Sequence, residues 1–175
     1  MRFIVFILAT FMIATLQLPP THAANGDTYR LGAGDKVRVT VFGESYLSGE
    51  FNVNANGTIS LPLIEPVPVA GKTLAEAEQL IRTKLAAGFI SDPKVSVDIL
   101  EYRPFFIIGE VSNPGSYPYI ADMTVLHAVA IAGGFTPRAA KSKIFIQRGA
   151  KEGIPVQHNT PVLPGDIITV KERFF

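Results

Sequence analysis

The chain has 175 residues and a formal net charge of only +1 at neutral pH, from 16 Lys and Arg against 15 Asp and Glu. This balance argues against a basic nucleic-acid-binding surface and against an acidic, solvated chain. The sequence also holds no cysteine. That excludes a disulfide framework, a thiolate metal site, a cysteine nucleophile and the lipid-modified cysteine of a bacterial lipoprotein.

The N-terminus predicts a cleaved secretory signal peptide over residues 1–23. Arg2 gives a short basic start, an apolar run extends from Phe3 to Leu16, and small residues around Ala23 mark the cleavage site. A membrane-spanning helix needs about 18 or more apolar residues, so this run is too short for an anchor. We therefore expect an exported protein whose mature part is residues 24–175.

Residues 29–101 have the pattern of one small module. Alternation of apolar and polar residues over 35–41 predicts a half-buried strand. Segments 51–55 and 58–61 flank Asn56-Gly57, which predicts a β-hairpin with a two-residue turn.

A helix and a strand complete this module. Thr73 and Glu76 form a capping-box pattern that predicts the start of a helix over 74–87, with Gly88 at its end. An alternating strand is expected over 94–100.

Residues 103–174 predict a second small module. It is expected to begin with a strand at 105–111, followed by a turn at Asn113-Pro114-Gly115 with glycine in the left-handed position. A helix at 125–132 follows, capped by Thr124 and ended by Gly133-Gly134. Two further strands are expected at 144–148 and 167–170, with a turn at 161–166 before the second. Strands, one helix, then strands is typical of an α+β fold of the β-grasp kind. Modules this small bury only about 60% of their unfolded surface, so we expect them to gain stability from packing on each other or in an oligomer.

Two glycine-containing segments resemble nucleotide-binding motifs, but neither has the complete motif. Gly71-Lys72-Thr73 lacks the earlier glycine of a phosphate loop, because that position is Pro66. Gly32-Ala33-Gly34 precedes a strand instead of following one, so it is interpreted as a turn. Asp35 follows that turn and Asp166 follows a similar one, and we interpret both as structural residues that bond nearby backbone N–H groups.

No catalytic, cofactor-binding or metal-binding residue is predicted. His127 and His158 have no partner at a metal-ligand spacing. Local strand or turn context accounts for the carboxylates that could pair for glycoside hydrolysis, namely Glu44, Glu50, Asp92, Asp98, Glu101 and Glu110. We therefore expect a protein that is not an enzyme, with a hidden hydrolase as a minor alternative.

Several segments resemble the outer-membrane polysaccharide-export (OPX, Wza-type) family. The resemblance begins at Tyr29-Arg30-Leu31-Gly32-Ala33-Gly34-Asp35 and continues through residues 47–50, 56–64, 69–77 and 92–97. The second module resembles the SLBB (soluble-ligand-binding β-grasp) domain through residues 109–117, 126–132 and 133–139. The order and spacing of these segments, which cover most of residues 29–172, carry the likeness.

The resemblance implies a periplasmic protein, associated with the outer membrane, that helps to export capsule or exopolysaccharide. It implies a homo-oligomeric ring that passes polysaccharide and meets an inner-membrane polysaccharide co-polymerase. Longer members of the family carry a lipidated cysteine and a membrane-crossing C-terminal helix, which this sequence lacks. We therefore expect a separate outer-membrane channel to complete the path. A glycan- or peptidoglycan-binding module without a conduit role is the alternative.

Two glycine-rich turns are the candidate contact sites for a ligand or a neighbouring subunit. One contains Asn113, Pro114, Gly115 and Tyr117, and the other contains Gly133, Gly134, Phe135 and Arg138. Both expose backbone and permit unusual φ angles. The alternative is that these turns only shape the β-grasp fold.

Overall fold

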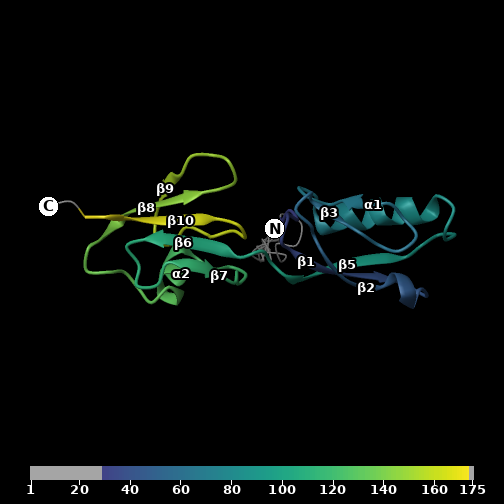
Figure 1. Cartoon of the computed structure of the whole chain (residues 1–175), viewed down its shortest axis with the longest axis horizontal. Helices are drawn as coiled ribbons and strands as arrows, with labels where there is room; N and C mark the ends of the chain where they lie inside the picture. Colours follow the sequence, from purple (N-terminus) through teal and green to yellow (C-terminus); the bar gives the residue numbers. More distant parts are fainter. Residues whose placement is uncertain (1–28, 174–175) are drawn as a thin grey trace, which may run out of the picture.

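The computed structural model describes residues 29–173, and the predicted signal peptide lies outside this range. Two small modules lie end to end along the long axis of the molecule (Figure 1). Each has its own hydrophobic core, one built from residues between Leu31 and Val97 and the other from residues between Phe105 and Val170. The predicted α+β class with two modules is confirmed.

The first module contains a three-stranded antiparallel sheet, a two-stranded ribbon and one long helix. Its elements are β1 (Lys36–Val41), the 3-10 turn η2 (Ser45–Leu47), β2 (Gly49–Asn52), β3 (Thr58–Ile59), β4 (Val67–Pro68), α1 (Leu74–Ala86) and β5 (Val95–Glu101). The sheet order is β2-β1-β5, and β3 pairs with β4. Because side chains alternate along β1, Val37, Val39 and Val41 are all buried in the first core.

Helix α1 begins where the capping box predicts. The Thr73 backbone N–H donates to Glu76 Oε2 at 2.8 Å, and the Glu76 N–H donates to Thr73 Oγ1 at 3.2 Å. Its buried face, formed by Ala77, Ile81 and Leu85, packs in the first core. With 13 residues it is the longest helix among residues 29–173, and none in that range is long and apolar enough to cross a membrane.

The second module is a five-stranded mixed sheet covered by a short helix. Its elements are β6 (Phe105–Gly109), β7 (Gly115–Tyr117), α2 (Val125–Ile131), β8 (Ala139–Gln147), β9 (Ile154–Val156) and β10 (Ile167–Glu172). The order is β7-β6-β10-β8-β9, with β10 parallel to β6 and the other pairs antiparallel. The buried α2 residues Val125, Ala128 and Val129 join the second core. A parallel central pair with a helix in its connection is the arrangement expected of a β-grasp fold.

The predicted hairpin around Asn56-Gly57 is wrong in its pairing. A tight turn does form, because the Gly57 N–H donates to the Asn54 carbonyl oxygen and Asn54 Oδ1 accepts from the Asn56 and Thr58 N–H groups. Only Gly57 has a positive φ, of 75°, whereas a type I′ turn needs two such residues. The flanking segments therefore diverge, β2 to pair with β1 and β3 to pair with β4.

The predicted left-handed glycine at residue 115 is also wrong. Gly115 is the first residue of β7 and does not have a positive φ. It pairs with Ile107 in an antiparallel register, so the chain turns before this glycine.

Candidate functional site

The buried carboxylate of Asp35 organises the start of the first module. It accepts hydrogen bonds from the Gly32 N–H at 2.7 Å, from the Tyr29 hydroxyl at 2.7 Å and from the Arg103 N–H at 2.8 Å. Arg103 Nη1 adds an ion pair at 3.0 Å. Burial, followed by the hydrogen bond to this carboxylate, raises the pKa of Tyr29 far above its usual range. The prediction that Asp35 is structural is confirmed.

Asp166 repeats this chemistry in the second module. Its Oδ2 accepts from the Leu163 N–H at 2.8 Å, and its Oδ1 accepts from Arg148 Nε at 3.0 Å. The preceding Gly165 has a φ of 84°, as Gly34 before Asp35 has a φ of 95°. The two turns therefore share one design, a left-handed glycine followed by an aspartate that bonds back to the turn.

The two modules meet at residues 102 and 103. The Tyr102 ring contacts the rings of Tyr29 and Tyr119, with centroids 5.0 and 5.2 Å apart. The Arg103 guanidinium lies so close to Gly32 and Gly165 that a Cβ at either glycine would collide with it. Arg103 thus contacts both glycine-aspartate turns and joins the modules.

The first candidate turn, residues 113–117, packs against the end of α2. The Asn113 N–H donates to the Ala132 carbonyl oxygen at 2.8 Å, and a Cβ at Gly133 would lie 2.6 Å from Asn113 Nδ2. Tyr117 donates to the Asn113 carbonyl oxygen at 2.6 Å and stacks on Phe105. Pro114 and Gly115 are exposed. The structure thus brings the two candidate turns together, and Asn113 and Tyr117 make contacts within the second module.

The second candidate turn leads into an open groove. Gly133 and Gly134 end α2 with φ values of 81° and 87°. Phe135 lines the groove, whereas Arg138 forms an ion pair with Glu172. The hydrogen bond and charge of Glu172 raise the pKa of Arg138.

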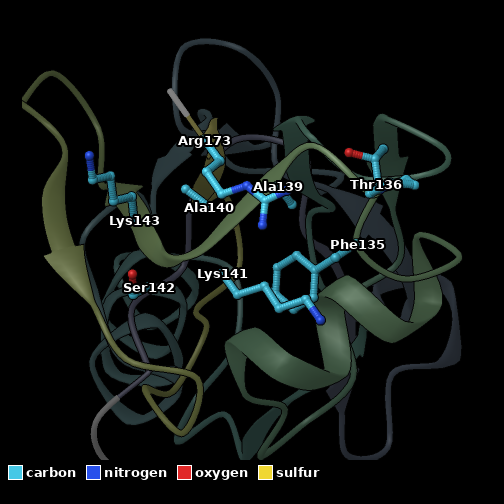
Figure 2. A pocket seen from close by; sticks show the side chains of 9 residues that line it. Phe135, Thr136, Ala139, Ala140, Lys141, Ser142, Lys143 and Arg173 are labelled. Carbon is cyan, nitrogen blue, oxygen red and sulfur yellow. The ribbon is translucent and has the colours of Figure 1, made fainter. Parts of the chain in front are cut away.

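Two neighbouring grooves flank the start of strand β8, and we call them together the β8 groove. One, of about 680 Å³, is lined by Phe135, Thr136, Pro137, Ala139, Ala140, Lys141, Ser142, Lys143 and Arg173 (Figure 2). The other, of about 610 Å³, is lined by Lys141, Ser142, Val156, Gln157, His158 and Asn159. Lys141 and Ser142 line both. Sequence reasoning missed this surface because it placed the strand at 144–148, although Lys141-Ser142-Lys143 carries a visible charge signal.

Several of the carboxylates considered for hydrolysis have partners in the structure. Among residues 29–173, no group of three His, Asp or Glu side chains could hold a metal ion. Hydrogen bonds from Lys36 and then Arg38 lower the pKa of Glu50, and Lys94 lowers that of Asp92. Glu110 accepts from the Thr136 hydroxyl at 2.5 Å. A carboxyl group acting as a general acid needs a raised pKa, and Glu50 and Asp92 are shifted the opposite way.

Two family models match this chain in succession, over the same two modules. The model described as polysaccharide biosynthesis/export protein matches residues 23–100, and the SLBB domain matches residues 104–162. The chain therefore belongs to the polysaccharide biosynthesis/export family and carries an SLBB domain. Two of the relatives described next are named for polysaccharide transport or export.

Curated relatives support this assignment. The chain is 37% identical over 135 residues to the exopolysaccharide production protein ExoF of Rhizobium meliloti, covering 70% of this chain and 32% of ExoF. It is 31% identical over 124 residues to the polysialic acid transport protein KpsD of Escherichia coli, covering 69% and 22%. It is 29% identical over 188 residues to the EPS I polysaccharide export outer membrane protein EpsA of Ralstonia solanacearum, covering 86% and 49%. The chain thus spans less than half the length of each.

Proposed function

We propose that this protein is a component of a conduit that exports capsule or exopolysaccharide chains across the outer membrane. The observation that carries the proposal is the match of both modules, in order, to the two domains of the export family over residues 23–162. Relatives named for polysaccharide transport or export align over most of the chain. The proposed function is transport, in line with relatives that are named for transport or export.

The proposed working form is a homo-oligomeric ring in the periplasm, at the outer membrane. Its partners would be an inner-membrane polysaccharide co-polymerase and a separate outer-membrane channel. Exposed apolar side chains on the outer face of the second sheet support assembly, because Phe106 and Ile108 on β6 remain 42% and 46% exposed. Each module also has a small core of its own, which favours further packing.

Deleting the gene tests the proposal directly. Polysaccharide outside the cell and polysaccharide retained in the periplasm are measured in the deletion strain and in a strain complemented with the full chain. We expect the external pool to fall and to recover on complementation. Normal export, in a strain without a second gene of this family, would overturn the proposal.

The β8 groove favours a second candidate, a glycan-binding module without a conduit role. Sedimentation of the purified full chain separates the two. A defined oligomer supports the conduit, and a monomer that binds glycan supports the module.

A further inference from the structure

We propose that the β8 groove binds carboxylate-bearing sugar units of a polysaccharide chain. The inference rests on the proposed export function and adds the chemical class of the substrate. It starts from the charge of the second module. Residues 103–173 carry eight Lys and Arg against five Asp and Glu, whereas residues 29–102 carry seven against nine. An anionic ligand is therefore favoured by the second module and disfavoured by the first.

Three of these eight positively charged residues line the β8 groove. Its lining includes Lys141, Lys143 and Arg173 and no Asp or Glu. Nearby acidic groups are already engaged, since Glu172 pairs with Arg138 and Glu110 accepts from Thr136. Among residues 29–173, Lys141 and Lys143 make no ion pair, so a carboxylate of the ligand would be their first.

Lys141 is held in place before any ligand arrives. Its ammonium lies 5.9 Å from the centre of the Phe135 ring, a cation–π contact. The Phe135 and His158 rings are 5.8 Å apart, and His158 Nε2 lies 2.7 Å from the Lys141 carbonyl oxygen. In Figure 2 the side chains of Phe135, Lys141 and Arg173 surround the same hollow. A positioned ammonium loses less conformational entropy on binding than a free one.

The remainder of the lining suits sugar hydroxyl groups. Within the described part of the chain, the side chains of Ser142, Gln157 and Asn159 have no hydrogen-bond partner, and all three are exposed. They supply both donors and acceptors. Because the two parts of the groove adjoin at Lys141 and Ser142, the surface accommodates an extended chain on both sides of β8. Its open form suits a polymer that must slide past.

The test uses NMR titration of the purified full chain with two matched probes. These are hexagalacturonate, whose sugars carry carboxylates, and its fully methyl-esterified form, which is neutral. We expect hexagalacturonate to shift the amide signals of residues 139–143 and 156–159, with an affinity that falls as salt rises. The ester should bind about ten-fold more weakly, since it loses two exposed ion pairs that each contribute up to roughly five-fold.

Substitutions of lysine then show which positive charges bind the probe. Lys141→Gln with Lys143→Gln should weaken binding of hexagalacturonate about ten-fold. Lys72→Gln with Lys151→Gln, which removes two exposed lysines outside the groove, should leave it within about two-fold. Phe135→Leu keeps an apolar side chain but removes the ring beside Lys141, and we expect an intermediate loss.

Several outcomes would overturn the inference. These are no binding of hexagalacturonate, equal binding of the ester, or equal effects of the two lysine pairs. A change in oligomeric state caused by the groove variant, without a change in probe binding, would make the groove a contact between copies instead.

Measuring polysaccharide export in the variant strain and in the deletion strain distinguishes failure of this inference from failure of the proposed function. Normal export by the K141Q/K143Q strain, with export lost on gene deletion, would overturn the groove assignment and leave the conduit role intact. Normal export after deletion would overturn the conduit role, and the titration with hexagalacturonate alone would then decide whether the groove binds carboxylate-bearing sugars.

Discussion

The carboxylate of Asp35 is completely buried and accepts hydrogen bonds from Tyr29, Gly32 and Arg103. Removing its charge leaves the Arg103 guanidinium without its partner in a partly buried position. We expect Asp35→Asn to lower the free energy of unfolding by about 3 kcal/mol, the lower end for breaking a buried pair. Urea unfolding of the purified chain measures this loss.

Asp166→Asn is the matched comparison. Its partner Arg148 has a side chain that is 41% exposed, compared with 27% for Arg103, so water screens the pair more strongly. We expect a smaller loss, about 1 kcal/mol. Equal losses for the two variants would show that burial of the arginine does not determine the strength of these pairs.

The ion pairs of Glu50 with Lys36 and Arg38 should make the stability of the folded protein depend on pH. Hydrogen bonds from Lys36 and then Arg38 lower its pKa below the ordinary value of 4.5. Its contribution is therefore fully present above about pH 4.5 and is lost as pH falls through the lower pKa of the folded state. We expect Glu50→Gln to flatten the fall in stability below pH 4.5. Thermal unfolding at a series of pH values checks this, with Glu152→Gln, at an exposed glutamate, as the control.

At the scale of elements, locally encoded features were predictable. The helix over 74–87 follows from its capping box and apolar face, and both turn aspartates follow from the glycines before them. Strand pairing was not predictable, because the partner of β2 is set by contacts with β1 and not by the turn at Asn56-Gly57. The contact role of the two candidate turns stays a prediction. Phe135 lines the groove, but Lys141 and Lys143 were missed because they lie where the register of β8 with β10 shifts, between Ala139 and Ile144.

Substitution of Gly109 tests how closely the backbones of β6 and β10 approach each other. It has a φ of 89°, and a Cβ there would collide with the Val170 carbonyl oxygen. Gly43 has a similar φ of 83° with open space around it. We expect Gly43→Ala to cost about 1 kcal/mol for its backbone conformation alone. Gly109→Ala should cost about 3 kcal/mol or more, because the collision adds to the strain. Equal losses in chemical unfolding would contradict the close approach of the two strands.

At the scale of the whole molecule, two separate cores are joined by a narrow junction. Tyr102 and Arg103 lie between β5 of the first module and β6 of the second, and Arg103 contacts both glycine-aspartate turns. The Gly165 N–H also donates to the Pro104 carbonyl oxygen at 3.1 Å. Since each core is complete within its own module, the junction can loosen without unfolding either one. The relative orientation of the modules therefore depends on few side chains.

Arg103→Ala should broaden the distribution of orientations between the modules. The sequence contains no cysteine, so spin labels can be attached selectively after Ser96→Cys on β5 and Ser116→Cys on β7, both exposed positions. Electron–electron resonance then measures the distribution of distances between the labels. We expect a narrow distribution in the parent and a clearly wider one in the variant, because the guanidinium no longer bridges Asp35 and the Gly165 turn.

Arg148→Ala is the control, since it removes the partner of Asp166 within the second module and leaves Arg103 in place. It should lower stability but keep the narrow distance distribution. An unchanged distribution in the Arg103 variant would mean that the Tyr29, Tyr102 and Tyr119 ring contacts suffice to fix the junction. A ring assembled from this chain would then have its module angle set by aromatic packing, and not by the buried ion pair.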